Sequence, residues 1–157
     1  MEEKRIISAP FTDETIKSLH AGDMVYISGT IYTARDAAHK RLCEMLDAGE
    51  PMPFNFEGQA VYYAGPCPAK PGQPIGSVGP TTGGRMDAYS PRLIKQGLRV
   101  MIGKGSRSED VIDALKNIPE STLLPLVAQP HLWQRLLKRQ KLLPSMSLEQ
   151  RLYAVFG

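Results

Sequence analysis

The chain has 157 residues, which is long enough for one domain with a sizeable core. Its residues are 42% hydrophobic and 22% charged, as in ordinary globular proteins. A net charge of +3 is too small to indicate nucleic acid or an acidic membrane surface as a partner. The charged start predicts no signal peptide, and no apolar run is long enough to span a bilayer. A cytoplasmic location is therefore expected.

Strand patterns alternate with helical patterns along most of the chain, which predicts an α/β fold. The expected strands are residues 4–8, 24–32, 60–64 and 98–102. The expected helices run from a cap at residue 12 or 13 to 19, over 34–48, from 86 or 91 to 96, and from a Ser108 cap to 117. Gly29 marks a bulge or a close backbone approach, and Gly49 ends the second helix. His39 is expected on the flank of that helix.

The loop from Gly79 to Asp87 is the most informative stretch. Glycines and a proline give a tight turn with an exposed backbone, and Thr81, Thr82 and Arg85 project from it. Free N–H groups, hydroxyls and a guanidinium at one point suit a small carboxylate or phosphate. The sequence therefore predicts an anion site here.

Further polar groups fall at strand ends or helix starts, where ligands bind in open α/β sheets. With the loop residues, the candidates are Thr33, Arg35, Thr81, Thr82, Arg85 and Lys104. Two guanidinium groups and one ammonium indicate a ligand with two carboxylates. Simpler interpretations remain open: surface arginines, a turn lysine at Lys104, and threonines that cap the next helix.

Neither a nucleotide-binding site nor a metal site is expected. Residues 97–104 resemble a P-loop but have one residue too many between the glycines, and Gly105 stands where Ser or Thr is required. Cys43 and Cys67 have no metal-ligand spacing, so no metal site and no disulfide framework are predicted. Cys43 is interpreted as a small core residue of its helix.

Several segments, in order and at suitable spacing, resemble the class I fumarase β subunit. They are residues 22–30, 32–41, 63–66, 75–82, 85–87 and 101–105. The likeness runs from about Arg5 to Asn117. The β subunit of tartrate dehydratase shares this scaffold, but the amino-acid sequences of residues 34–39 and 85–87 favour fumarase. The resemblance implies a swivelling β/β/α-type single domain with a mixed sheet and flanking helices.

The resemblance also implies a mechanism for a hydro-lyase that interconverts malate and fumarate. A 4Fe–4S cluster on a separate α subunit would bind the substrate hydroxyl as a Lewis acid, and this chain would hold no iron. Arg35, Arg85, Lys104 and Thr82 would bind the dicarboxylate. Thr81 would take part in proton transfer, and its weakly basic hydroxyl would need activation by neighbouring charges. The chain alone is expected to be inactive.

The likeness stops near Glu120, where the family would continue with a strand and a Gly-Gly-Ala-Ala-Ala helix start. We therefore divide the chain into a catalytic domain (1–119) and an atypical helical tail (120–157). If the codons of the tail are read one base out of frame, with permitted synonymous codons, they can encode an amino-acid sequence typical of the family over some thirty positions. We hypothesise that residues after about Pro119 are frameshifted, and sequencing the gene for a single-base change that restores a fumarase ending decides this.

The altered tail has a physical consequence. A replaced core strand and helix would reduce stability or change association, although Leu132, Leu136, Leu137 and Leu143 can form a helix that covers part of the core. Three hypotheses follow: a fumarate hydratase β subunit, a tartrate dehydratase β subunit, and a non-catalytic remnant whose tail binds another partner or a second copy of this chain.

Overall fold

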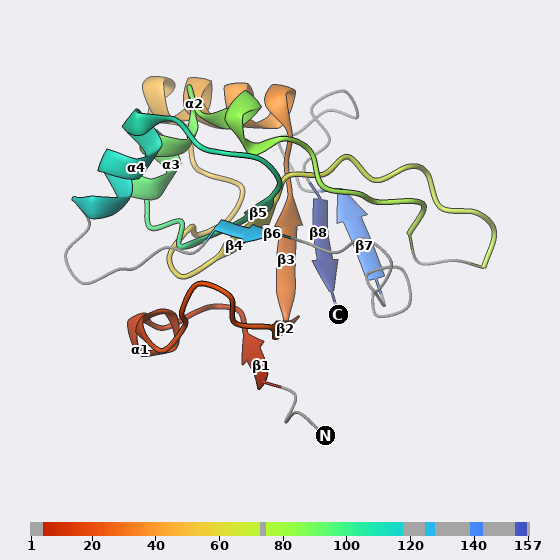
Figure 1. Ribbon diagram of the computed structural model, residues 1–157. Helices are drawn as coiled ribbons and strands as arrows, with labels where there is room; N and C mark the ends of the chain where they lie inside the picture. Colours follow the sequence, from red (N-terminus) through yellow and green to blue (C-terminus); the bar gives the residue numbers. More distant parts are fainter. Residues whose placement is uncertain (1–4, 73–74, 118–124, 128–138, 143–152, 157) are drawn as a thin grey trace.

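The computed structural model describes residues 5–72, 75–117, 125–127, 139–142 and 153–156 (Figure 1). It confirms an α/β domain. Its strands are β1 (Arg5–Ser8), β2 (Val25–Ser28), β3 (Thr30–Thr33), β4 (Ala60–Tyr62), β5 (Val100–Gly103), β6 (Pro125–Val127), β7 (Arg139–Leu142) and β8 (Tyr153–Phe156). Its helices are α1 (Asp13–Lys17), α2 (Asp36–Ala48), the 3-10 helix η1 (Gly83–Met86), α3 (Ser90–Lys95) and α4 (Glu109–Lys116).

The strands form two sheets. β1 and β2 pair in parallel, and the larger sheet has the order β6-β5-β4-β3-β8-β7. Within it β3, β4, β5 and β6 run parallel, while β8 is antiparallel to β3 and to β7. In Figure 1, α2, α3 and α4 lie on the opposite side of the larger sheet from α1 and the small sheet.

Gly29 divides a segment that the sequence predicts as one β-rich stretch. It has a φ of +93° and lies between β2 and β3, which belong to different sheets. A Cβ at this position would stand 2.7 Å from the carbonyl oxygen of Ala9. The predicted close backbone approach is confirmed, but a single strand is wrong, because the chain changes sheets where only glycine fits.

The ends of the first two helices follow the sequence signals. Thr12 caps α1 by accepting a hydrogen bond from the N–H of Thr15 at 3.2 Å. Gly49 ends α2 in the left-handed conformation, and its N–H donates to the carbonyl of Leu46. α2 begins at Asp36, two residues later than expected, because Ala34 continues the sheet by donating to the carbonyl of Tyr62.

The next helix begins close to the second of its two predicted starts, since α3 spans Ser90–Lys95, and the 3-10 helix η1 precedes it. The hydroxyl of Ser90 donates to the carbonyl of Met86 between the two. Ser108 precedes α4 as predicted, but its side chain makes no cap hydrogen bond. Its hydroxyl is buried with no hydrogen-bond partner among the residues that the structure describes, while its N–H donates to Asp87 Oδ2 at 2.6 Å.

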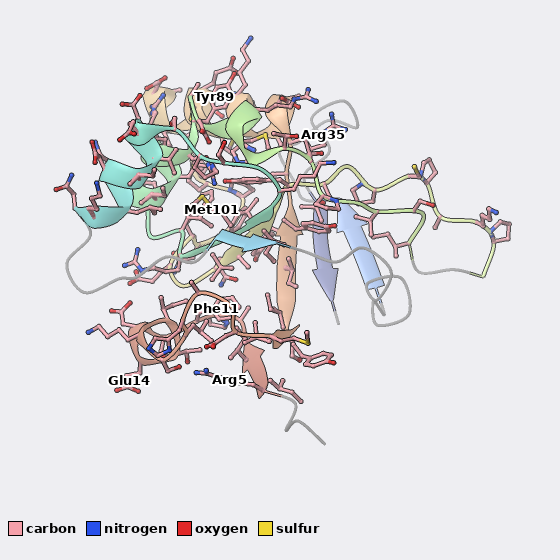
Figure 2. The ribbon with its side chains drawn as sticks, in the orientation of Figure 1. Arg5, Phe11, Glu14, Arg35, Tyr89 and Met101 are labelled. Atoms are coloured by element: carbon pink, nitrogen blue, oxygen red, sulfur yellow. The ribbon has the colours of Figure 1, made fainter. Side chains whose placement is uncertain are left out.

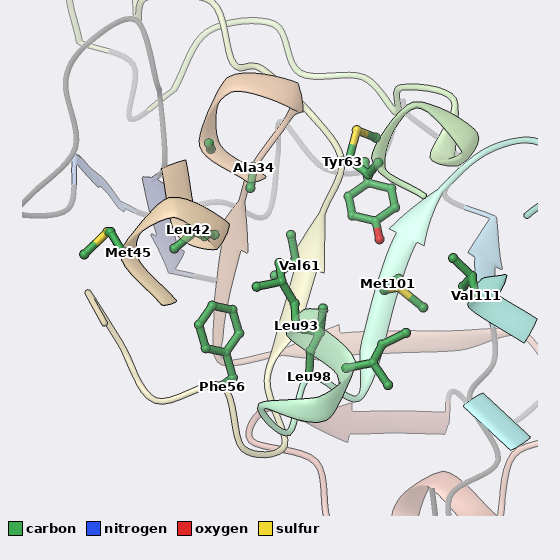
Figure 3. Packing of buried hydrophobic residues seen from close by; sticks show 13 residues of the cluster. Ala34, Leu42, Met45, Phe56, Val61, Tyr63, Leu93, Leu98, Met101 and Val111 are labelled. Atoms are coloured by element: carbon green, nitrogen blue, oxygen red, sulfur yellow. The ribbon is translucent and has the colours of Figure 1, made fainter. Parts of the chain in front are cut away.

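The central strands β4 and β5 of the larger sheet are buried on both faces, as parallel strands require. Side chains alternate between two hydrophobic clusters: Val61 and Met101 face the cluster beside the helices, whereas Ala60, Tyr62 and Ile102 face the cluster beside α1. Figure 3 shows the first cluster, in which Leu42 and Leu93 reach the sheet from α2 and α3. This packing fixes the ends of β3, β4 and β5, which position the candidate site.

The predicted division at residue 119 stays a prediction. The helix proposed for Leu132, Leu136, Leu137 and Leu143 lies outside the described residues. Within the tail the structure describes the short strands β6, β7 and β8, two of which pair with β5 and β3.

Candidate functional site

The candidate residues lie at the carboxyl edge of three neighbouring parallel strands. Arg35 follows β3 and Lys104 follows β5, while Tyr63 follows the intervening β4. The N–H of Tyr63 donates to the carbonyl of Ile102 at 2.8 Å, so the strand ends remain in register beyond the sheet. Figure 2 shows Arg35 at the helix end of β3. This is the edge at which α/β sheets bind ligands.

The loop at residues 79–87 is bonded directly onto this edge. The N–H of Thr81 donates to the carbonyl of Tyr63 at 2.6 Å, and the N–H of Lys104 donates to the carbonyl of Thr81 at 3.3 Å. Thr82 and Lys104 pair as an isolated parallel bridge, and the N–H of Gly83 donates to the carbonyl of Lys104 at 2.7 Å. The structure therefore brings both threonines and Lys104 together. Thr82 precedes η1 but makes no side-chain cap bond, so the capping alternative is wrong for it.

Glycine at the end of β5 makes this close approach feasible. A Cβ on Gly103 would lie 2.9 Å from Cδ2 of Tyr63 and 3.3 Å from the carbonyl oxygen of Thr81. Any larger residue would force the ring of Tyr63 to move, because 2.9 Å is shorter than real Cβ contacts, and it would press on the carbonyl of Thr81.

Arg85 and Arg35 meet at one carboxylate, that of Asp36. Arg85 binds Asp36 through two parallel hydrogen bonds, from Nε to Oδ1 at 2.9 Å and from Nη2 to Oδ2 at 3.0 Å. Nη2 of Arg35 lies 3.7 Å from the same Oδ2. The aliphatic part of Arg35 passes over Gly65, where a Cβ would stand 3.1 Å from its Cδ. The predicted convergence of the two arginines is thus seen in the structure, through an acid that the sequence analysis did not select.

A buried polar network holds the far end of the loop. Arg107 donates from Nε to Asp87 Oδ1 at 2.6 Å and from Nη2 to the hydroxyl of Ser90 at 2.8 Å. Its guanidinium also lies over the ring of Tyr63, 5.2 Å from the centroid. Sequence reasoning missed Arg107, although an acid at the end of the loop and a lone arginine before the next helix were available signals.

His39 is fully buried in the first turns of α2, so its expected place on the helix flank is wrong. Its Nδ1 lies 2.9 Å from the carbonyl oxygen of Arg35, which can only accept, so Nδ1 carries the proton in this contact. Nε2 is buried and has no hydrogen-bond partner in the described part of the chain. Desolvation lowers the pKa of His39 to about 4, so the imidazole is neutral near pH 7 and holds the backbone of Arg35.

The charges at this edge favour an anion. Arg35, Arg85 and Lys104 supply three cations against the single carboxylate of Asp36, and Lys104 is exposed with no ion-pair partner among the described residues. Two positive charges therefore remain uncompensated within this group. A small dianion is the ligand that such a site neutralises best.

The described part of the chain offers no set of ligands for a metal centre. No three His, Cys, Asp or Glu side chains gather there. Cys43 is buried in α2, where burial raises the pKa of its thiol, whereas Cys67 is exposed. These two cysteines, one buried and one exposed, do not form the ligand set of an iron–sulfur cluster.

Comparison of the sequence with known families identifies the family of this chain. The family model described as fumarase C-terminus matches residues 2–144. The chain belongs to this fumarase C-terminal family. Known proteins that are similar to it include the anaerobic class I fumarate hydratase of Escherichia coli strain K12, 46% identical over 89 residues. The aerobic class I fumarate hydratase of Salmonella typhimurium strain LT2 is 46% identical over 91 residues.

The L(+)-tartrate dehydratase subunit beta of Escherichia coli strain K12 is 37% identical over 105 residues. These matches cover 56%, 57% and 65% of this chain, in the order given. They cover 16% of the length of each fumarate hydratase and 51% of the tartrate dehydratase subunit. Among the described residues of this family member, no helix is long and apolar enough to cross a membrane.

Proposed function

We propose that this chain is the β subunit of an iron–sulfur-dependent hydro-lyase that interconverts malate and fumarate. The observation that supports the proposal is that Arg35, Lys104 and the loop carrying Thr81 and Arg85 lie at one sheet edge, with more positive than negative charge. Three cations beside a hydroxyl are what a reaction on a four-carbon dicarboxylate requires.

Each residue has a distinct part in this proposal. Arg35 and Arg85 bind carboxylate oxygens through their guanidinium groups, Lys104 adds a point charge, and Thr82 adds a hydrogen bond. Thr81 transfers the proton at the carbon next to the one that carries the hydroxyl. The nearby cations stabilise the negative charge that builds up on the substrate carboxylate as this proton leaves.

The remaining chemistry belongs to a partner. A 4Fe–4S cluster on a fumarase-type α subunit would supply the Lewis acid for the substrate hydroxyl. The working unit is then a heterodimer that acts in the tricarboxylic acid cycle in the cytoplasm, and this chain alone is inactive. Association of the heterodimer with further copies is compatible with the proposal.

A tartrate dehydratase β subunit is the second candidate. Its favouring observation is that the match to the tartrate enzyme's subunit beta covers 65% of this chain and about half of that subunit, more than the matches to the fumarate hydratases cover. Tartrate is also a four-carbon dicarboxylate, so the same cations would serve it.

The test is co-expression of the full chain with a fumarase-type α subunit under anaerobic conditions. Hydration of fumarate and dehydration of malate and L(+)-tartrate are then assayed. Faster turnover of malate and fumarate supports the first proposal, and faster turnover of tartrate supports the second. A complex that forms but turns over none of them identifies a non-catalytic remnant. Arg85→Ala should abolish most of the activity, and full activity in that variant would contradict the site assignment.

A further inference from the structure

Asp36 occupies a place between the two arginines that no assigned role explains. It is the first residue of α2, so its backbone is fixed by the helix, and the helix N-terminus favours its negative charge. Its side chain reaches across to Arg85, 49 residues away in sequence. An acid among substrate-binding cations weakens their pull on an anionic ligand, so its presence needs a reason.

The geometry of the contact between Asp36 and Arg85 supplies a reason for the presence of this acid. A guanidinium has two edges that can bind a carboxylate with paired hydrogen bonds: the side edge, formed by Nε and one terminal nitrogen, and the end edge, formed by both terminal nitrogens. Asp36 binds the side edge, through Nε and Nη2. Nη1 has no partner among the described residues, so the end edge remains open to a ligand.

The contact also couples the two arginines. Oδ2 of Asp36 is 3.0 Å from Nη2 of Arg85 and 3.7 Å from Nη2 of Arg35. One carboxylate oxygen therefore holds two guanidinium groups near each other against their mutual repulsion. Both arginines are about half exposed, and without such a partner these long side chains would populate many rotamers.

We propose that Asp36 is a positioning residue for dicarboxylate binding. It fixes the guanidinium of Arg85 by its side edge, holds that of Arg35 beside it, and so presents the open edges to one substrate. The inference rests on the proposed function of this site. It contrasts with the opposite role, in which Asp36 is a competitor that occupies Arg85 until the substrate displaces it.

A matched control lies on the same helix. Asp47, near the end of α2, pairs through both carboxylate oxygens with Arg92, away from the site. Asp36→Asn and Asp47→Asn remove the same charge from a carboxylate–arginine pair, but only the first pair involves site residues. Asp36→Glu keeps the charge and adds one methylene.

The kinetic experiment uses the full chain assembled with the α subunit. We expect Asp36→Asn to raise KM for fumarate about tenfold, with a smaller change in kcat. Without Asp36, substrate binding must also supply the conformational entropy lost when the arginine side chains become ordered. Asp36→Glu should recover part of the loss, and Asp47→Asn should leave KM unchanged. A KM that stays at the wild-type value, or falls as for a competitor, would overturn the inference.

A second readout keeps the inference separate from the proposed function. In the isolated full chain, the Nε–H signal of Arg85 in nitrogen–proton NMR reports whether the side chain is held. We expect a shifted, slowly exchanging signal in wild type and in Asp47→Asn, and its loss in Asp36→Asn. If the wild-type complex turns over no substrate, the proposed function fails while this signal still decides the role of Asp36. If the Arg85 signal is the same in Asp36→Asn as in wild type, the positioning role of Asp36 is overturned.

Discussion

Arg107 and Asp87 form an ion pair whose side chains are only 8% and 11% exposed, with Nε and Oδ1 2.6 Å apart. The second oxygen of Asp87 accepts the N–H of Ser108 at 2.6 Å. The pair therefore joins the end of the anion loop to the start of α4. It holds in place the loop that carries Thr81 and Arg85.

Removing the cation of this pair should be costly. Arg107→Met leaves the carboxylate of Asp87 buried without its partner, and we expect a loss of about 3 kcal/mol in the free energy of unfolding. Urea unfolding followed by circular dichroism measures it. The control is Arg41→Met, which breaks the more exposed pair with Glu50 and should cost less than about 1 kcal/mol. Equal losses in the two variants would contradict the structural role assigned to Arg107.

The change of sheet at Gly29 gives a second prediction. Gly29→Ala forces a side chain onto a φ of +93° and places its Cβ 2.7 Å from the carbonyl oxygen of Ala9. We expect a loss of at least about 3 kcal/mol in stability, from strain and overpacking together. Gly22→Ala, at a φ of +98° with open space around it, should cost only about 1 kcal/mol. Thermal unfolding of both variants separates the clash from the backbone strain.

His39 makes stability depend on pH in a defined window. Its pKa is 6.5 in the unfolded chain and about 4 in the folded protein, so the unfolded chain binds the proton first as the pH falls. Its contribution is complete above about pH 6.5 and is lost progressively down to about pH 4, a total of about 3 kcal/mol.

Urea unfolding at several pH values tests this. His39→Gln keeps an N–H for the carbonyl of Arg35 but cannot titrate, so the dependence on pH between 6.5 and 4 should become shallower. His20→Gln, the same substitution at an exposed position, serves as the control. An unchanged slope in His39→Gln would show that the imidazole does not stay neutral inside the protein.

Much of this architecture follows from local signals in the sequence. The cap at Thr12, the stop at Gly49 and the placement of cations after β3 and β5 each depend on a few neighbouring residues, and all are found in the structure. The placement of Arg35 and Lys104 at one edge follows from the rule that parallel strands end together, whereas Arg85 reaches this edge on the loop of residues 79–87.

The residues that sequence reasoning missed depend on contacts distant in the chain. Arg107 meets an acid 20 residues away, and Asp36 meets an arginine 49 residues away. A helical pattern with an acid in its first turn is fully explained by the helix dipole, so nothing local marked Asp36 as part of a site. His39 was misplaced because a polar residue on a helix is usually exposed, whereas here one hydrogen bond to Arg35 and packing against Tyr63 accommodate it.

The central claim is that Thr81 transfers a proton during hydration of fumarate, and kcat of the assembled complex with Thr81→Val tests it most directly. Valine has the same shape without the hydroxyl, whereas Thr81→Ser keeps the hydroxyl and serves as the control. We predict that Thr81→Val lowers kcat by at least about a hundredfold and that Thr81→Ser retains most of the activity. A Thr81→Val complex that hydrates fumarate at the wild-type rate would contradict the account.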